Sequence, residues 1–351
     1  MKGVANAIMV VRLGSSSLLR NWINCFFVAG KDQRKPDVIC LMGPTASGKT
    51  NLAVELVKLH PFEIINVDSA QIYRGMDIGT GKPSQATLKV APHRLLDIRD
   101  PAELYSAADF QTDAIGEILT ILKSGKVPLL VGGTMLYFRV LRDGLADLPK
   151  ANQKVRQDIE TMAKNHGWER VHSQLAVVDP EAAARIHPKD PQRLQRALEV
   201  FLLSGKRLTE FFNEEAEQRS DGLKKQPFNF HFFGIQPPDR IVLHNRISKR
   251  LNQMLADGFI SEVQDLYNRG DLSDRLPSMK SVGYRQIWQF LSGQFDYKEM
   301  VEKSNVATRQ LAKRQYTWLR SWPSLNILKD GGLDSRDKVL NYCQSISILK
   351  N

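Results

Sequence analysis

The residues best suited to chemistry form a phosphate-binding loop. The loop consists of Gly43, Pro44, Thr45, Ala46, Ser47, Gly48, Lys49 and Thr50. It fits the pattern G-x-x-x-x-G-K-[ST] and lies between an apolar run and a helical pattern, the context that such loops require. Its glycines let successive N–H groups point inward, Lys49 adds positive charge, and the Thr50 hydroxyl can reach a phosphate oxygen or a metal ion. The sequence therefore predicts phosphate binding, in a nucleotide hydrolase, a small-molecule kinase or another enzyme that handles phosphate.

Asp68 is the acidic residue best placed to share this site. Hydrolases and kinases of this class hold Mg²⁺ with an acid that closes an apolar strand. The strand expected at 127–131 ends in Gly132, Gly133 and Thr134, with no acid, whereas the strand expected at 62–68 ends in Asp68. Because ligands bind at the carboxyl ends of parallel strands, we expect Asp68 to face the loop. A helix cap or an ordinary loop carboxylate is the alternative.

Short apolar strands alternate with helical patterns in the part of the chain that carries these residues. Strands are expected at 37–42, 62–68 and 127–134, and helices at 51–60 and 102–123. Such alternation is typical of an α/β protein with a mainly parallel sheet. Together with the phosphate-binding loop it predicts a P-loop NTPase-like core that begins at residue 37, with residues 37–146 as its first part.

Helical periodicity replaces the strands at 147–228. Two helix starts are marked by Asp179-Pro180 and Asp190-Pro191, where Asp caps the helix and Pro occupies its first turn. We therefore expect an all-helical insertion domain at 147–228. The strand-like run at 230–235 indicates a return to the sheet, and residues 229–346 complete the core with C-terminal helices. Residues 1–36 are expected to be a disordered extension, although their basic, serine-containing composition also fits a mitochondrial presequence.

The charge of the chain points to a polyanionic partner. Its 351 residues carry a net charge of +11, with 42% hydrophobic residues, which is a globular and strongly basic composition. Lysine and arginine gain affinity for phosphate chains by releasing counterions, so nucleic acid is the first candidate. Three separated cysteines indicate neither a disulfide framework nor a zinc site. Since no apolar run is long enough to span a membrane, we expect a soluble, cytoplasmic protein.

Six motifs, taken in order, resemble the tRNA dimethylallyltransferase (tRNA isopentenyltransferase) family. They are GPTASGKT, DSAQIYRGMDIGTGKP, LLVGGTMLY, DPQRLQRALEV, SVGYRQIW and TRQLAKRQYTWLR. The resemblance covers residues 36–346 and departs from many members only in details such as Gly81 for Ala. The absence of a zinc-finger tail makes the chain similar to the compact bacterial form, for which we expect a monomer. The resemblance implies transfer of a dimethylallyl group from dimethylallyl pyrophosphate to the exocyclic amine of the adenosine 3′ to a tRNA anticodon.

This resemblance gives roles to the candidate residues. Asp68 is expected to be the general base that takes a proton from the adenine amine. By resemblance, Thr134 donates to the bridging oxygen of the leaving pyrophosphate, Lys49 and the loop amides hold the phosphates, and Thr50 helps to place Mg²⁺. Arg246 and Arg250 stand one turn apart on a predicted helix, and either could clamp the pyrophosphate.

Candidate tRNA contacts come from three basic segments and from residues that match family positions. The segment 192–196 puts side chains on one helical face, 280–286 combines charge with a ring expected to stack on a base, and 309–320 interleaves basic and aromatic residues. For each segment alone a solvated helix face is an equal alternative. The candidates are Asp68, Ser69, Ala70, Gln71, Thr134, Arg156, Gln192, Arg193, Leu194, Gln195, Arg196, Lys280, Ser281, Val282, Gly283, Tyr284, Arg285, Gln286, Arg309 and Lys313.

Two other functions remain compatible with the phosphate-binding loop. A P-loop kinase of a small metabolite predicts ATP turnover and indifference to tRNA. An RNA-binding ATPase switch predicts nucleotide-dependent RNA affinity without a covalent product.

Overall fold

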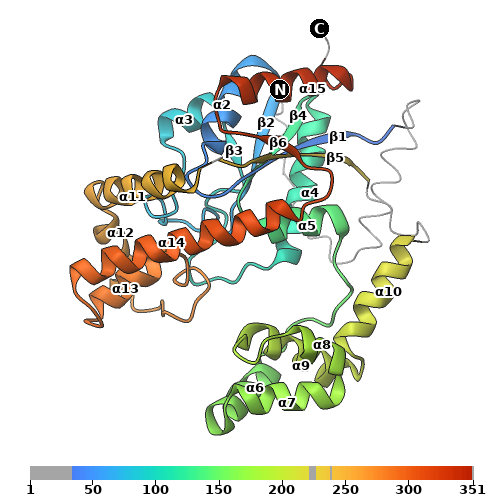
Figure 1. Cartoon of the computed structure of the whole chain (residues 1–351), viewed down its shortest axis with the longest axis vertical. Helices are drawn as coiled ribbons and strands as arrows, with labels where there is room; N and C mark the ends of the chain where they lie inside the picture. Colours follow the sequence, from blue (N-terminus) through green and yellow to red (C-terminus); the bar gives the residue numbers. More distant parts are fainter. Residues whose placement is uncertain (1–33, 221–226, 238, 350–351) are drawn as a thin grey trace, which may run out of the picture. The chain divides into compact units, whose positions relative to one another are not determined.

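The computed structural model describes residues 34–220, 227–237 and 239–349 (Figure 1). Most of the extension expected at 1–36, and part of the end of the insertion expected at 147–228, lie outside these residues. The chain divides into two compact units. The first consists of the described residues of Met1–Leu104, Ala114–Met135 and Pro227–Asn351, and the second of Tyr105–Asp113 and Leu136–Gln226.

A single parallel sheet of six strands forms the centre of the first unit, in the order β3-β2-β4-β1-β5-β6. The strands are β1 (Asp37–Met42), β2 (Phe62–Val67), β3 (His93–Arg94), β4 (Val127–Gly132), β5 (Asn229–Ile235) and β6 (Asn326–Leu328). The four predicted strands are confirmed as β1, β2, β4 and β5. The P-loop NTPase-like fold is confirmed as well, because the phosphate-binding loop follows β1 and opens the next helix.

The return of the chain to the sheet is also confirmed. In β5, Phe232 lies opposite Cys40 of β1, so a strand that follows the helical segment pairs with the first strand. The sequence did not predict β3 and β6. They have two and three residues, which is too short for an apolar alternation to stand out.

The core of the first unit lies where helices cover the sheet. Helices α2 (Lys49–Leu59) and α15 (Leu333–Ser345) pack side by side over it (Figure 1). Leu52 and Leu56 of α2 join Val339 and Cys343 of α15 in one cluster that is buried with the strand residue Ile39. Because parallel strands covered in this way are apolar on nearly every position, they appear in the sequence as continuous hydrophobic runs.

Five further helices lie entirely within the first unit. These are α3 (Gln85–Val90), α11 (Arg240–Ala256), α12 (Phe259–Asn268), α13 (Tyr284–Leu291) and α14 (Tyr297–Arg320). Along α14, the capping box of Asp296 and Glu299 fixes the start, since each side chain accepts the other residue's backbone N–H. None of the described helices is long and apolar enough to cross a membrane.

The helix predicted at 102–123 begins later, as α4 (Ala107–Lys123). The expected start was wrong because the preceding residues make a turn of their own. The Asp100 side chain accepts the N–H of Ala102 at 2.9 Å, and Ser106 accepts the N–H of Asp109 at 3.2 Å. Ser106 therefore caps the start of α4.

The second unit is all-helical in its described part. It contains most of α5 (Met135–Asp143), with α6 (Gln153–His166), α7 (Trp168–Val178), α8 (Pro180–Arg185), α9 (Pro191–Ser204) and α10 (Leu208–Ser220). Both predicted helix starts are confirmed, since Asp179 accepts the N–H of Ala182 and Asp190 that of Arg193. The unit includes residues 136–146, which precede the start expected at 147.

Candidate active site

Three neighbouring strands bring the predicted residues to one cavity. Because β4 lies between β1 and β2, the loop after β1, Asp68 after β2 and Gly133 after β4 meet at the same edge of the sheet. They line a cavity of about 170 Å³ whose other walls come from α11, α12, α13 and α14. The structure thus places the side chain of Asp68 in the same cavity as Lys49, which the sequence predicts.

In this structure the lysine of the phosphate-binding loop forms a hydrogen bond with the backbone of the same loop. Gly48 has φ 92° and ψ 10°, a left-handed conformation that glycine adopts easily and that lets α2 start directly at Lys49. The Lys49 Nζ donates to the carbonyl of Pro44 at 2.7 Å. Burial lowers the pKa of Lys49 to about 7, with the carboxylate of Asp68 raising it and the guanidinium of Arg250 lowering it further. A bound anion would restore its charge.

Only one of the two oxygens of the Asp68 carboxylate accepts a hydrogen bond from the described residues. Its Oδ1 accepts the N–H of Ala70 at 2.9 Å, and no second hydrogen bond reaches this carboxylate from the described residues. The buried side chain of Asn66 donates to the carbonyl oxygens of Leu95, at 3.2 Å, and of Asp68 itself, at 3.4 Å, which fixes the end of β2. Asp68 therefore keeps acceptor capacity on the cavity side.

Thr134 connects the ends of β4 and β2. Its hydroxyl oxygen accepts the N–H of Ser69 at 3.0 Å, and its backbone N–H donates to Val67 at 3.2 Å. Gly132 makes this approach possible, because a Cβ there would lie 2.0 Å from the carbonyl oxygen of Val67. Thr134 sits beside the residue that follows Asp68, at the edge of the cavity that Gly132 and Gly133 line.

The two candidate arginines of α11 have different surroundings. Arg250 lines the cavity, with its guanidinium 3.4 Å from the Thr45 hydroxyl and 3.4 Å from the Thr80 carbonyl oxygen. Burial lowers the pKa of Arg250, and the carboxylate of Asp68 opposes that shift. Arg246 is exposed and lines an adjoining pocket that also contains Lys82. Arg250 is thus the arginine that already faces the phosphate-binding loop.

Gln315 of α14 joins two walls of the cavity, and the sequence reasoning missed it. Its Oε1 accepts the N–H of Thr45 at 2.9 Å, and its Nε2 donates to the Gly133 carbonyl at 2.9 Å. A Cβ at Gly133 would lie 2.4 Å from that Nε2. The charge of the segment drew attention to its basic residues, although the spacing of Thr308, Leu311 and Gln315, which all line the cavity, indicates one helix face.

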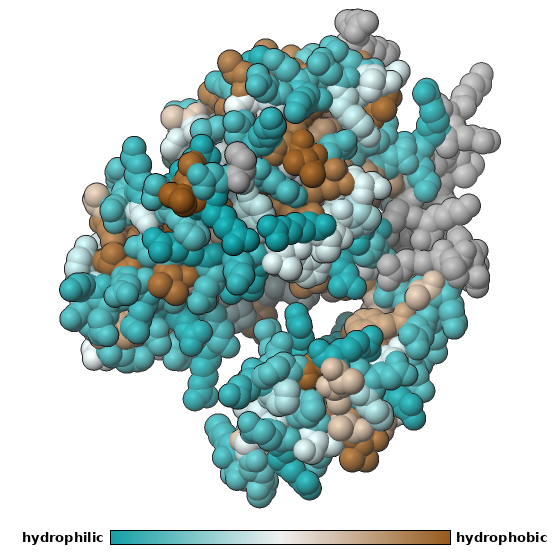
Figure 2. All heavy atoms as spheres, in the orientation of Figure 1, coloured by the Kyte–Doolittle hydropathy of each residue, from teal (hydrophilic) through white to brown (hydrophobic). Residues whose placement is uncertain are grey.

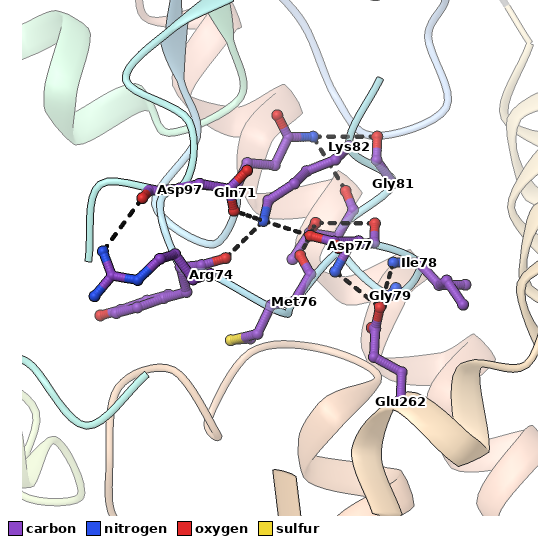
Figure 3. A network of polar contacts seen from close by, with 12 residues as sticks. Gln71, Arg74, Met76, Asp77, Ile78, Gly79, Gly81, Lys82, Asp97 and Glu262 are labelled. Atoms are coloured by element: carbon purple, nitrogen blue, oxygen red, sulfur yellow. Dashed lines mark hydrogen bonds and ion pairs between the residues drawn. The ribbon is translucent and has the colours of Figure 1, made fainter. Parts of the chain in front are cut away.

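The loop at 76–82 is fixed from inside by Lys82 (Figure 3). The Lys82 Nζ donates to the Tyr73 carbonyl at 2.6 Å, to Asp77 Oδ1 at 2.6 Å and to Asp97 Oδ1. Only 6% of its side chain is exposed, so this ammonium is committed to the loop and unavailable to a ligand. The lysine of the sequence GTGKP is therefore structural here.

Glu262 of α12 holds the same loop from outside (Figure 3). Its carboxylate accepts the backbone N–H groups of Asp77, Ile78 and Gly79 at 2.8, 2.7 and 3.1 Å. The hydroxyl of Tyr284 donates to it at 2.5 Å. Nothing in the local sequence identifies Glu262, because its partners are distant in the chain and three of them are backbone groups.

Two predicted tRNA contacts are wrong because the side chains are buried. Tyr284, the ring expected to stack on a base, has no exposed surface, and its ring packs at 5.0 Å from that of Phe259. Burial and the neighbouring Glu262 carboxylate raise its pKa. Leu194 is likewise fully buried, in the core of the helical unit. Both residues pack in the protein interior, where they contact neighbouring apolar side chains.

The neighbours of Tyr284 lie close to the cavity. Ser281, Val282 and Gly283 line it with Tyr284, while Lys280 and Arg285 are exposed. Gln286 accepts the N–H of Gly283 at 2.8 Å through its side chain, so it caps α13. This segment therefore contributes backbone to the cavity and positive charge to the surface, but no exposed ring.

Within the helical unit, a buried carboxylate gathers two of the predicted arginines. Glu199 has no exposed surface and accepts from Arg156 at 2.9 and 3.1 Å and from Arg196 at 2.7 Å. Gln195 donates to the Arg156 carbonyl at 3.2 Å. Arg193, with a side chain that is 72% exposed, and Gln192, also exposed, complete this surface. Glu199 lies in the motif DPQRLQRALEV, but nothing in its local sequence indicates that its carboxylate pairs with two arginines.

The family of the chain follows from a sequence comparison. A model of the IPP transferase family matches residues 71–322, which is more than half of the chain. The chain belongs to this family. The phosphate-binding loop and Asp68 precede the matched segment, so their placement in this IPP transferase rests on the cavity just described and on the structural likenesses that follow.

Solved structures of related enzymes match this IPP transferase over 89% of its length. The tRNA isopentenylpyrophosphate transferase of Bacillus halodurans is 34% identical, with 96% of its chain covered and a TM-score of 0.63. That of Staphylococcus epidermidis is 31% identical, with 100% covered and a TM-score of 0.63. A eukaryotic dimethylallyltransferase acting on tRNA is 26% identical, with 78% covered and a TM-score of 0.70.

Proposed function

We propose that this protein transfers the dimethylallyl group of dimethylallyl pyrophosphate to the exocyclic amine of the adenosine 3′ to the anticodon in tRNAs, releasing pyrophosphate. The observation that carries the proposal is the shared cavity of Asp68 and Lys49. A carboxylate with a free oxygen faces a phosphate-binding loop there, and the strand end at Gly133 carries no acid. A kinase would need a metal-binding acid at such a position.

In this reaction a carbon–nitrogen bond forms while the bond between the allylic carbon and the bridging oxygen breaks. The pyrophosphate leaves with the electron pair of that bond, and the amine loses one proton. An adenine amine is a poor nucleophile, so a carboxylate that accepts this proton lowers the barrier. Asp68 is assigned to that step because its carboxylate lines the cavity and accepts only one hydrogen bond from the described residues.

The stabilisation of the negative charge that develops on the pyrophosphate is assigned to the cavity wall opposite Asp68. Lys49, the amides of residues 43–50 and Arg250 supply positive charge there, and the Thr134 hydroxyl supplies a donor toward the bridging oxygen. Once these donors face the bound pyrophosphate, they need no further rearrangement during the reaction. The hydrogen bond that Lys49 now gives to Pro44 is exchanged for one to the phosphate.

Mg²⁺ is the proposed metal, held mainly by the substrate. The described residues contain no group of three or more His, Cys, Asp or Glu side chains that could hold an ion. Thr50 lines the cavity and offers a hydroxyl oxygen, the kind of ligand that Mg²⁺ prefers, and Mg²⁺ commonly takes the rest of its ligands from substrate phosphates and water. When bound, the ion neutralises part of the charge on the pyrophosphate.

The tRNA is proposed to be held by exposed basic residues of both units. In the helical unit the exposed basic residue is Arg193, with the exposed Gln192 and the half-buried Arg156 and Arg196 beside it. In the first unit the residues are Lys280, Arg285, Arg309 and Lys313. Extrusion of a stacked base costs a few kcal/mol, which phosphate contacts and contacts to the base must offset. We assign the binding position of the extruded adenine to the part of the cavity beside Asp68–Gln71 and Ser281–Gly283. The reaction is assigned to the cytoplasm.

The proposal is tested by incubating the protein with dimethylallyl pyrophosphate, Mg²⁺ and unmodified tRNA. Mass spectrometry of the digested tRNA should show a prenylated adenosine beside the anticodon, and phosphate analysis should show an equal amount of pyrophosphate. A folded protein that hydrolyses ATP but leaves the tRNA unmodified would instead support the kinase alternative. If the protein only hydrolyses dimethylallyl pyrophosphate to free dimethylallyl alcohol and leaves the tRNA unmodified, the proposal is also contradicted.

A further inference from the structure

Part of the catalytic cavity is lined by the loop at 76–82. Gly79, Thr80 and Gly81 belong to the cavity wall, and both glycines contribute backbone atoms only. At Gly81 a Cβ would lie 1.9 Å from Nη2 of Arg250, so the loop backbone is in close contact with that side chain. The shape of this wall therefore depends on the groups that hold the backbone of the loop.

The carbonyl of Thr80 connects this loop with the phosphate-binding loop through Arg250. The Arg250 guanidinium lies 3.4 Å from the Thr80 carbonyl oxygen and 3.4 Å from the hydroxyl of Thr45. In the described part of the chain no carboxylate forms an ion pair with Arg250, and these two oxygens are its only hydrogen-bond partners. The direction of the guanidinium thus depends on the position of Thr80.

Glu262 binds the N–H groups of the same loop (Figure 3). Its Oε2 accepts those of Asp77 and Ile78, at 2.8 and 2.7 Å. Its Oε1 accepts that of Gly79 at 3.1 Å and the hydroxyl of Tyr284 at 2.5 Å. Each carboxylate oxygen therefore accepts two hydrogen bonds, and hydrogen bonds to a carboxylate are roughly twice as strong as neutral ones.

The Glu262 carboxylate projects from a packed helix. Glu262 lies in the first turn of α12, where Phe259 and Val263 are buried. Lys82, which also fixes the loop, bonds only to oxygen atoms. Among the described residues, Glu262 is the only side chain that accepts the three N–H groups of Asp77–Gly79.

We propose that Glu262 is a positioning residue for the transfer reaction, and that it aims Arg250 at the pyrophosphate of the prenyl donor. The effect passes from the Glu262 carboxylate through the loop backbone to the Thr80 carbonyl, and from there to the guanidinium. Glu262 does not line the cavity, so it acts on the reaction without touching either substrate. The inference rests on the proposed function for the identity of the donor.

The position of Arg250 matters because the leaving pyrophosphate gains negative charge as its bond to carbon breaks. Groups that stabilise this charge are most effective when they are in place before the reaction. A displacement of about 1 Å in such a group can cost roughly a hundredfold in rate. Without Glu262 the Thr80 carbonyl is free to move, and Arg250 loses one of its two partners. Pyrophosphate binding measures this loss independently of the chemical step.

The test compares Glu262→Gln with the unchanged protein by calorimetric titration of inorganic pyrophosphate in the presence of Mg²⁺. The variant keeps the size of the side chain but has a single acceptor oxygen for the three N–H groups. Pyrophosphate affinity should fall about tenfold, and the KM for dimethylallyl pyrophosphate should rise by a similar factor.

Affinity for tRNA provides a readout that should not move with the donor. Over α14 the face drawn in Figure 2 is largely hydrophilic, and exposed side chains there, such as Lys313, lie outside the contacts of Glu262. Because phosphate contacts dominate RNA affinity, Glu262→Gln should change tRNA binding less than about twofold. Equal losses of tRNA and pyrophosphate affinity would contradict the inference.

A double-mutant cycle with Arg250→Gln separates positioning from a general loss of stability. If Glu262 acts through Arg250, then Glu262→Gln should change pyrophosphate affinity less than about twofold once Arg250 is replaced. A purely structural role of Glu262 predicts the same loss of affinity in both backgrounds. That result would overturn the inference.

Asp265→Asn is the matched control, since Asp265 is an exposed carboxylate of α12 outside these contacts. It should leave pyrophosphate affinity unchanged, and an equally tight Glu262→Gln protein would overturn the inference. Thermal unfolding checks that each variant is folded. If Glu262→Gln unfolds below the assay temperature, Glu262→Asp replaces it, because its shorter carboxylate should cause a smaller loss in the same direction.

Failure of the proposed function is distinguishable from failure of this inference. If the unchanged protein binds pyrophosphate but forms no prenylated adenosine, and Glu262→Gln still loses pyrophosphate affinity only when Arg250 is present, the proposed function fails while the positioning role stands. If prenylated adenosine forms and Glu262→Gln matches the unchanged protein in pyrophosphate affinity and donor KM, the function stands and the inference fails.

Discussion

At the scale of single residues, Lys49 is the group whose chemistry depends most on the cavity. Its pKa is lowered to about 7 by burial, whereas a bound pyrophosphate favours the charged ammonium and raises the pKa again. Below pH 7 the ammonium is already charged, so its contribution to binding is constant. Above pH 7 each binding event must take up a proton, and the contribution weakens as the pH rises.

Calorimetry of dimethylallyl pyrophosphate binding, without tRNA, checks this expectation. In buffers of different ionisation enthalpy at pH 8, the protein should take up a fraction of a proton per donor bound, and the affinity should fall between pH 7 and pH 9. Lys49→Arg retains its charge throughout this range, so it should remove the part of the pH dependence that exceeds the titration of the donor itself. Equal profiles for the two proteins would contradict the assigned pKa.

The sequence identified the reactive residues better than the residues that support them. Lys49 and Asp68 were predicted to share a site because strand ends and glycine loops have recognisable patterns. Tyr284 was assigned to RNA because an aromatic residue in a basic segment has the same pattern whether its ring is exposed or buried. Gln315 and Glu262 went unrecognised, since their partners are backbone groups far away in the chain.

At the scale of elements, α14 links two walls of the catalytic cavity through the side chain of Gln315. Gln315→Ala leaves the N–H of Thr45 and the carbonyl of Gly133 without the partners that they now have. An unsatisfied buried group costs about 1 to 3 kcal/mol, so the free energy of unfolding should fall by about that amount or more. Because Thr45 belongs to the phosphate-binding loop, the KM for the prenyl donor should rise more than the KM for tRNA.

Denaturant unfolding and steady-state kinetics measure these two effects. Gln310→Ala is a suitable control, because Gln310 lies on α14 but is exposed and loses the same atoms. It should leave the unfolding free energy and the donor KM nearly unchanged. A Gln315→Ala protein as stable as the control would mean that the two hydrogen bonds contribute little.

At the scale of the whole molecule, periodicity predicted β1, β2, β4, β5 and the helical segment between β4 and β5, whereas the limits of the compact units have no such pattern. The predicted strands and the helical segment follow from short-range hydrophobic patterns within single elements. The assignment of Tyr105–Asp113 and α5 to the helical unit depends on contacts between segments far apart in sequence, as in the ring stack of Phe110 on Tyr137 at 4.1 Å. No local pattern records such contacts.

The central claim is that Asp68 accepts the proton of the adenine amine across the cavity from Lys49. Its most direct test is the single-turnover rate of prenyl transfer by Asp68→Asn, with both substrates saturating. Asn keeps the size of the side chain and an oxygen for the N–H of Ala70, so tRNA and donor affinities should change little. The rate should fall by about 10²- to 10⁴-fold, which is roughly 3 to 5 kcal/mol of barrier. A rate within a few-fold of the unchanged protein would contradict the account.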